Sequence, residues 1–229
     1  MCGRFSQSQP SAAIAQAFQI AVPPLTPRYN IAPTQSVATV LRTPEQKDRQ
    51  FRILHWGLIP SWAKDAKIGA KLINARAETV AEKPAFRSAF RHRRCLVLAD
   101  GFYEWQQQEN KKQKQPYYFR LQDGRPFAFA GLWERWKDAN GDEMESCTFL
   151  TTEANELMRP IHSRMPVILD PKGYDLWLDP EVKQPELLKP LLRPYPTQEM
   201  EAYPVSKAVN KPSNDSSECI ESIEVPLKY

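Results

Sequence analysis

The chain has 229 residues and a formal net charge of +4, and 41% of its residues are hydrophobic. This is enough apolar material for a buried core, and the charge is compatible with a polyanionic partner without being the strongly basic signature of a duplex-DNA module. The N-terminus has no charged-then-apolar leader, and no apolar run approaches the roughly 18 residues that cross a bilayer. We therefore expect a cytoplasmic protein with no membrane partner.

The cysteines are few and widely separated. They are Cys2, Cys95, Cys147 and Cys219. Because no C-x-x-C spacing occurs, the pattern indicates neither a zinc site nor a disulfide framework. We therefore expect a reducing compartment, no metal and no cofactor.

The first residues hold the most reactive candidate group. Removal of Met1 leaves Cys2 with a free α-amine beside its thiol. Such a pair reacts with an aldehyde in two steps, an imine followed by a thiazolidine ring. With ordinary pKa values of about 8 and about 8.5, a minor share of both groups is nucleophilic at pH 7. The alternative is that Cys2 simply begins a buried strand.

The pattern of apolar residues predicts alternating helices and strands along the chain. Helical patterns occur at residues 11–18, 75–89, 153–158 and 181–192, and β-like segments at 36–41, 51–56, 95–99, 117–121, 127–131, 148–152 and 166–169. The prolines are scattered, with no linker and no repeat. We expect an α+β fold, a single domain over 1–229 with a β-rich, barrel-like core flanked by helices. The polar stretch 106–115 is expected to be a solvated hairpin tip. The polar stretch 207–218 is expected to be a solvated loop that opens a polar C-terminal segment.

A proline-containing turn follows the strand expected at 51–56. It ends in Trp62, and an exposed tryptophan stacks well on unpaired bases. The alternative is that Trp62 anchors the core, as most of the tryptophans must.

One spacing recurs three times: a chemically useful side chain followed two positions later by arginine. The pairs are Cys2 and Arg4, Asn74 and Arg76, and His162 and Arg164. In an extended segment, residues i and i+2 point to the same side, and an arginine there can hold a phosphate with two hydrogen bonds. The alternative is coincidence in an arginine-rich chain.

Glu104 lies among aromatic residues directly after the strand expected at 95–99. Desolvation by rings raises a carboxyl pKa and suits it to proton transfer near neutrality. Side chains alternate between the two faces of a strand, so Phe102 and Glu104 share one face and Tyr103 and Trp105 share the other. Both faces hold aromatic residues, so the pattern alone does not exclude the alternative that Glu104 faces solvent.

Among the histidines, His162 is the candidate for proton transfer, because it lies in an irregular loop bounded by prolines. His55 falls in an apolar strand and His92 in a cationic run, so neither is assigned a role in catalysis.

Six ordered blocks together resemble the SOS-response-associated peptidase family. They are MCGRF at 1–5, RYNIAPT at 28–34, WGLIPSW at 56–62, INARAET at 73–79, CLVLADGFYEW at 95–105 and IHSRMPVIL at 161–169. The resemblance runs from Cys2 to about residue 206, nearly the whole chain.

The resemblance implies a β-rich, barrel-like domain that acts on abasic sites in single-stranded DNA. Cys2 is then the covalent residue, forming a thiazolidine with the ring-opened sugar and shielding the lesion. Asn74 orients the Cys2 amine, Glu104 shuttles protons, and His162 assists proton transfer, including reversal of the crosslink.

The resemblance also assigns the DNA contacts. Arg4, Arg76 and Arg164 hold phosphates around the lesion, and Trp62 stacks where the strand bends. The implied partner is single-stranded DNA containing abasic sites, so we expect the protein to be associated with the nucleoid when it is bound to DNA. Nothing in the sequence suggests more than a monomer, and replication partners are not indicated. The name peptidase reflects loss of what precedes Cys2, for which a general aminopeptidase suffices here.

The chain departs from the family pattern at two positions. Ser163 stands where an acidic residue is more usual, which affects the orientation or proton affinity of His162. Gln106 stands where a lysine is frequent, which weakens DNA contact slightly.

Two other classes of protein fit the same residues. A cysteine peptidase would use Cys2 and His162 as nucleophile and base, with Glu104 or Asn74 as orienting group. A non-covalent binding module would depend on the arginines and Trp62 but not on Cys2.

Overall fold

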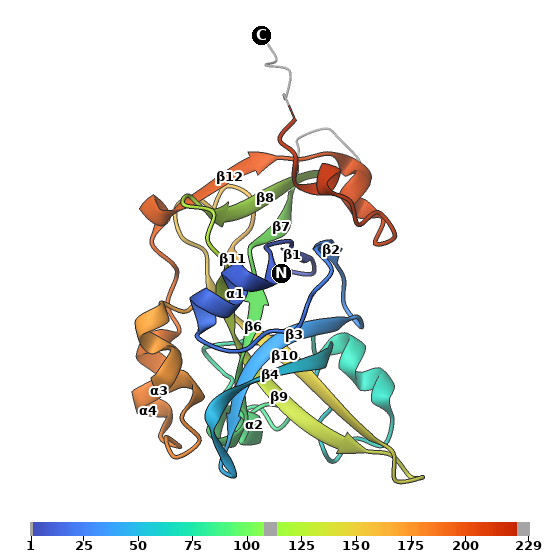
Figure 1. Ribbon diagram of the computed structural model, residues 1–229, viewed down its shortest axis with the longest axis vertical. Helices are drawn as coiled ribbons and strands as arrows, with labels where there is room; N and C mark the ends of the chain where they lie inside the picture. The colour runs from blue at the N-terminus through green and yellow to red at the C-terminus, as the bar shows by residue number, and fades with distance from the viewer. Residues whose placement is uncertain (1, 108–113, 224–229) are drawn as a thin grey trace.

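Two β-sheets form most of the computed structural model, which describes residues 2–107 and 114–223 (Figure 1). The first sheet has the strand order β12-β8-β7-β1-β2, and all its pairings are antiparallel. The second has the order β11-β10-β4-β3-β6-β9, with β5 added beside β10. The strand β1 lies where the two sheets meet (Figure 1).

The elements have the following bounds. The strands are β1 Phe5–Gln7, β2 Arg28–Ile31, β3 Ser36–Thr43, β4 Gln46–Trp56, β5 Asn74–Arg76, β6 Arg94–Ala99, β7 Gly101–Gln106, β8 Gln115–Leu121, β9 Phe127–Lys137, β10 Glu143–Glu153, β11 Arg164–Pro166 and β12 Met200–Pro204. The α-helices are α1 Ser11–Phe18, α2 Arg87–His92, α3 Tyr174–Leu178 and α4 Pro185–Leu188. The 3-10 helices are η1 Ala66–Lys71, η2 Pro171–Gly173, η3 Lys189–Leu191, η4 Thr197–Glu199, η5 Lys207–Asn210 and η6 Ser217–Ile220.

The second sheet closes on itself. Strand β9 pairs with both β6 and β10, and β10 pairs in parallel with the end of β4 through Ser146 opposite His55 and Cys147 opposite Trp56. The pairings therefore make a ring through β9, β6, β3, β4 and β10. This ring, with few and short helices, confirms the expected α+β, β-rich class.

Strand β6 explains how the core is divided. All its residues are buried, and they alternate between two apolar clusters. Cys95 and Val97 pack on the side that contains Cys2, whereas Leu96 and Leu98 pack on the opposite side, toward α2 and α3. Both faces of this strand are covered, which is why its residues 95–99 are continuously apolar.

Six of the seven expected strands are found. The strand expected at 166–169 is wrong, because β11 ends at Pro166 and Ile168 makes only an isolated bridge with Phe129. Only one expected helix is found in full, α1 at residues 11–18. The helix expected at 75–89 is wrong: its start is β5, which pairs in parallel with β10, and only its last residues enter α2. Residues 156–161 form turns rather than a helix. The helix expected at 181–192 is reduced to α4 and η3, each of which has a proline at its start.

The C-terminal segment is not the solvated loop expected from its polarity. It contains η5 and η6, and Val209 and Cys219 are buried. The Asp215 carboxylate accepts backbone N–H groups of Tyr29 and Asn30 at 2.6 and 2.8 Å. A few apolar residues and one capping carboxylate thus attach this polar segment to β2.

The other polar stretch, 106–115, begins at the end of β7 and returns as β8, whose first residue Gln115 pairs with Gln106. This confirms the expected hairpin. Its tip, residues 108–113, lies outside the described residues.

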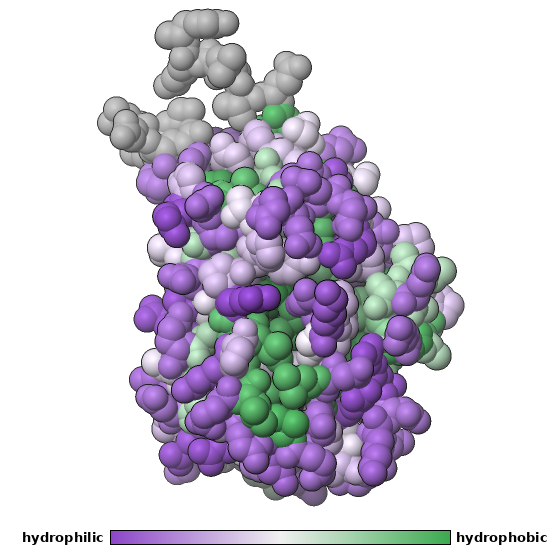
Figure 2. Space-filling model, turned by 90° about the vertical axis from the view of Figure 1, so that its left-hand side faces the viewer, coloured by the Kyte–Doolittle hydropathy of each residue, from purple (hydrophilic) through white to green (hydrophobic). Residues whose placement is uncertain are grey.

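The surface beside α3 and α4 is mostly hydrophilic around one apolar patch (Figure 2). Leu176 on α3 and Leu187 on α4 are among the exposed large apolar side chains. In the described part of the chain, no helix has the length and apolar character needed to cross a membrane.

Candidate functional site

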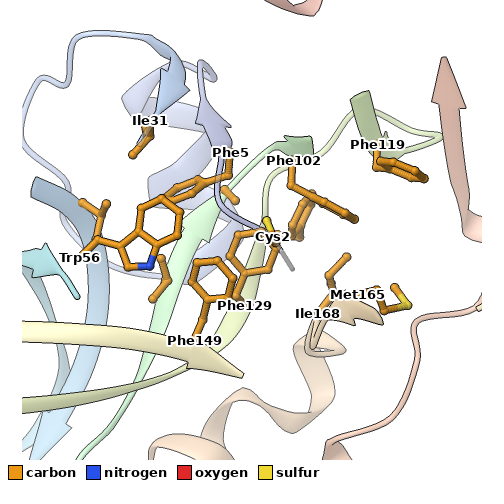
Figure 3. Close-up of a cluster of buried hydrophobic side chains, with 14 of the residues drawn as sticks. Cys2, Phe5, Ile31, Trp56, Phe102, Phe119, Phe129, Phe149, Met165 and Ile168 are labelled. Carbon is orange, nitrogen blue, oxygen red and sulfur yellow. The ribbon is translucent and has the colours of Figure 1, made fainter. Parts of the chain in front are cut away.

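Cys2 is buried where the two sheets meet, just before β1. Its side chain is 1% exposed and lies among the rings of Phe102, Phe129 and Phe149 (Figure 3). These rings come from β7, β9 and β10, so both sheets contribute to the surroundings of the thiol.

The thiol is held in its neutral form. Its sulfur lies 3.5 Å from the carbonyl oxygen of Arg4, which also accepts the backbone N–H of Tyr103 at 3.0 Å. Burial raises the pKa of the Cys2 thiol far above its usual range, and the negative charge of Glu104 raises it further. The sequence-based estimate of a minor thiolate share at pH 7 is therefore wrong for the folded protein, and the thiol must lose its proton during a reaction.

Glu104 faces the interior beside Cys2. Its neighbour by alternation, Phe102, belongs to the apolar cluster around Cys2, whereas Tyr103 packs in a separate cluster with Tyr118. Glu104 is 3% exposed. The solvent-facing alternative for Glu104 is therefore wrong, and its charge acts on the Cys2 thiol.

Asn74 opens β5 and pairs directly with Phe149 of β10. Paired residues on neighbouring strands project to the same face, so the Asn74 side chain points to the side where Phe149 packs near Cys2. Its amide donates to the carbonyl of Ile73 at 2.8 Å. Its buried Oδ1 has no hydrogen-bond partner among the described residues, which leaves an acceptor open to a nearby amine.

His162 lies in the turn before β11, at the border of the same cluster. Ile161 and Met165 on either side of it pack against the residues around Cys2. The backbone N–H of Arg164 donates to His162 Nδ1 at 3.0 Å. The same Nδ1 lies 3.2 Å from the carbonyl oxygen of Arg164, so the backbone of Arg164 holds the ring in either neutral tautomer. The end of β7 reaches this turn through Gln106, whose amide donates to the Pro160 carbonyl at 3.3 Å.

The arginines of β5 and β11 lie on opposite sides of β10. Arg76 pairs with Thr151 across the sheet and is exposed. Arg164 donates to the Thr151 carbonyl at 2.6 Å and to both carboxylate oxygens of Glu78. Thr151 and Glu78 thus organise this side of the site, and neither residue stands out in the sequence.

Arg4 is turned into the protein. Its Nη1 donates to Asn30 Oδ1 at 2.8 Å and to the Val209 carbonyl at 2.6 Å, and its guanidinium lies 5.8 Å from the centre of the Trp105 ring. Burial lowers the pKa of Arg4. Arg4 therefore connects the segment that carries Cys2 to η5.

Trp62 lies on the loop after β4 and is 60% exposed, so the alternative of a core anchor is wrong. In contrast, Trp56 is fully buried and donates from its indole to the Ile73 carbonyl at 2.9 Å. No group of three or more His, Cys, Asp or Glu side chains within 2–107 and 114–223 is placed to hold a metal ion.

The two joined sheets, with a cysteine near the start of the chain buried among aromatic rings beside a carboxylate, define a class of protein. The family model described as SOS response associated peptidase (SRAP) matches residues 1–212, and the chain belongs to this family. The chain is 46% identical over 226 residues to the abasic site processing protein YoqW of Bacillus subtilis, covering 97% of this chain and 100% of YoqW.

More distant relatives agree. The abasic site processing protein HMCES of Xenopus tropicalis is 35% identical, over 88% of this chain and 68% of HMCES. A crystal structure of a protein from Bacteroides thetaiotaomicron superposes with a TM-score of 0.84 at 28% identity, covering 97% of this chain and 100% of that one.

Proposed function

We propose that the protein processes abasic sites in single-stranded DNA by forming a covalent thiazolidine crosslink through Cys2 once Met1 is removed. Family membership and the relatives named abasic site processing proteins support the DNA lesion as substrate. The observation that carries the chemistry is the burial of Cys2 next to Glu104, where the thiol stays neutral until a substrate arrives.

The reaction begins at nitrogen. The α-amine attacks the aldehyde of the ring-opened deoxyribose, and loss of one water gives an imine. The thiol sulfur then bonds to the imine carbon, and its proton passes to the nitrogen as the C=N bond becomes single. Atoms balance as DNA plus protein minus one water. Because the folded state disfavours the thiolate, the amine acts first.

The surrounding residues take distinct parts in this sequence. Glu104 accepts and returns the protons that move during sugar opening, imine formation and thiol addition. The open Oδ1 of Asn74 accepts a hydrogen bond from the α-amine and fixes its direction. His162 donates a proton to the sugar oxygen during opening and reversal.

The arginines and Trp62 hold the strand. Arg76 is exposed and meets a backbone phosphate directly, whereas Arg164 is paired with Glu78 and must share or exchange that partner. Arg4 adds positive charge from within the protein, and Trp62 offers an exposed ring to a base. The protein acts as a crosslinking enzyme with lyase-like steps, and an autopeptidase activity would expose Cys2.

The cysteine peptidase alternative is less well supported. A peptidase nucleophile is activated by a depressed thiol pKa beside a cationic histidine. Here burial and the Glu104 charge raise the pKa of the Cys2 thiol. Blocking the α-amine by reductive methylation separates the two functions, since it abolishes crosslinking but leaves thiol-based proteolysis intact.

The deciding experiment incubates Met-processed protein with an oligonucleotide carrying one abasic site, followed by a denaturing gel and intact mass. We expect a complex with the mass of DNA plus protein minus one water. Cys2→Ala should lose this complex yet keep non-covalent DNA binding. A covalent complex of undiminished yield from Cys2→Ala or from amine-methylated protein would overturn the proposal, and a binding module would give no covalent complex at all.

A further inference from the structure

A basic hollow lies beside Trp62, outside the buried site. It encloses about 310 Å3 and is lined by Trp62, Ala63, Lys64, Asp65, Lys67, Ile68 and Lys71. Nothing in the reaction described above uses its lysines.

The hollow combines positive charge with an exposed ring. Lys64, Lys67 and Lys71 are exposed, and one carboxylate, Asp65, lines the hollow with them. That carboxylate caps η1 by accepting the backbone N–H of Lys67 at 2.8 Å, and it lies 4.0 Å from the Lys67 ammonium. The lining therefore keeps a net positive charge at neutral pH. Basic grooves next to aromatic side chains are typical of surfaces that bind single-stranded nucleic acid.

The walls of the hollow are fixed by the fold. Gly57 has a φ of +132°, and a Cβ there would lie 2.7 Å from the carbonyl oxygen of Gly69, so the loop after β4 packs directly on the backbone of η1. On the other side, the indole of Trp136 donates to the Ala63 carbonyl at 2.7 Å. A surface held in this way loses little conformational freedom on binding a ligand.

The hollow is close to the proposed reaction site along the chain. Lys71 precedes Asn74 by three residues, which span at most about 10 Å. The backbone N–H of Leu58 also donates to the Leu72 carbonyl at 3.2 Å, which ties the two segments together. A strand whose lesion lies near Asn74 thus passes this hollow within a few nucleotides.

We infer that this hollow is a second DNA subsite, which binds an undamaged nucleotide flanking the lesion. One base stacks on Trp62, and Lys64, Lys67 and Lys71 bind the adjoining phosphates. The reference to a lesion and the stacking on Trp62 rest on the proposed function; the phosphate contacts of the three lysines are the new part of this inference. An acidic protein would satisfy the lysines but would leave the exposed indole without a stacking partner, so the ring favours a nucleotide.

The first test compares two triple variants with the same change in net charge. One is Lys64→Ala, Lys67→Ala, Lys71→Ala; the control is Lys172→Ala, Lys183→Ala, Lys189→Ala, which removes exposed lysines near α3 and α4. Binding of undamaged single-stranded DNA is measured by anisotropy over a range of salt. Three lost phosphate contacts should lower the slope of log affinity against log salt by about 2. The control should keep the wild-type slope. Equal slopes in both variants would overturn the inference and would leave an acidic protein as the better partner for these lysines.

The second test uses variants of Trp62 and oligonucleotides that carry an abasic site at only one end. We expect Trp62→Ala to weaken binding about tenfold, as loss of one stacked base does, and Trp62→Phe to restore most of it. With Cys2→Ala protein and an abasic site at one end of the strand, the lysine variant should lose affinity for only one of the two strand polarities. Loss for neither polarity would overturn the inference. Because Cys2→Ala cannot crosslink, a failure of the proposed chemistry leaves these binding results unchanged, so the two failures are distinguishable.

Discussion

Arg164 and Glu78 form a two-point ion pair, with Nη1 to Oε1 at 3.0 Å and Nη2 to Oε2 at 2.9 Å. The same guanidinium donates to the Thr151 carbonyl, so the fork that would take a phosphate is filled by protein groups. Partial burial raises the pKa of Glu78, but the hydrogen bonds and charge of Arg164, with Arg76, outweigh it and lower the pKa overall. Glu78 is therefore ionised at neutral pH and competes with DNA for Arg164.

Replacing Glu78 by glutamine should tighten binding of undamaged single-stranded DNA. The variant weakens the ion pair and frees Arg164 for one more phosphate contact, which raises the salt slope by about 0.7. Affinity is measured by anisotropy from low to moderate salt. The matched control is Glu82→Gln, an exposed residue in the following turn that changes net charge equally. Equal effects of the two variants would show that the ion pair does not limit DNA binding.

Glu104→Gln should make the Cys2 thiol more acidic. The carboxylate charge raises the thiol pKa in addition to burial, so its removal lowers that pKa and increases the thiolate share at a given pH. Below the midpoint, the thiolate share of Cys2 is therefore larger in the variant than in the wild type at every pH. The measurement is the pH dependence of Cys2 alkylation by iodoacetamide, located by peptide mass.

Cys147 serves as the internal control for this measurement, because burial alone raises the pKa of its thiol. Its alkylation profile should stay the same in Glu104→Gln and in the wild type. If both cysteines shifted together, the variant would have loosened the core and the electrostatic explanation would be wrong.

The local sequence around each candidate residue was enough to predict much of the site. Cys2 with its α-amine and Glu104 among rings are local patterns that need no knowledge of the fold. Alternation could not decide which face of β7 is covered, because both are buried: Phe102 packs near Cys2 and Tyr103 packs near Tyr118. Only the position of β7 between β1 and β8 resolves this.

The residues that the sequence analysis missed act through long-range pairing. Thr151 connects Arg76 and Arg164 because β5 and β11 flank β10 on opposite sides. The helix expected at residues 75–89 was wrong because of a long-range pairing as well. Nothing near Ala75 in the sequence indicates that this residue pairs with Leu150. A tertiary pairing overrides local propensity here, and short strands such as β5 depend on it entirely.

Asp100→Asn should destabilise the fold by about 2–4 kcal/mol, because hydrogen bonds to a buried charge are worth about 1.5–3 kcal/mol each. Asp100 is 5% exposed and accepts the Ser6 hydroxyl at 2.5 Å, the Gln9 backbone N–H at 2.7 Å, and both the N–H and the hydroxyl of Ser8. The amide of asparagine would face some of these donors with another donor. Urea unfolding measures the change.

The control for this variant is Asp123→Asn, an exposed carboxylate paired with Arg125 at 2.9 Å. An exposed pair contributes about 0–1 kcal/mol, so this variant should unfold close to the wild type. Because Asp100 anchors the residues around β1, its loss should also slow crosslinking by Cys2. A loss of stability no larger than that of the control would mean that β1 is held by its strand pairings alone.

Gln19→Gly should stabilise the protein by about 0.5–1 kcal/mol. Gln19 ends α1 with a φ of 52°, a left-handed conformation that costs a non-glycine residue roughly 1–2 kcal/mol, partly offset by the greater freedom of glycine in the unfolded chain. The control is Gln16→Gly inside the same helix, which should destabilise by about 1 kcal/mol. Both variants delete the same side chain from an exposed position, so the unfolded-state term cancels between them. The difference in free energy of unfolding therefore isolates the backbone effect, and a difference near zero would show that the left-handed turn at Gln19 carries no strain.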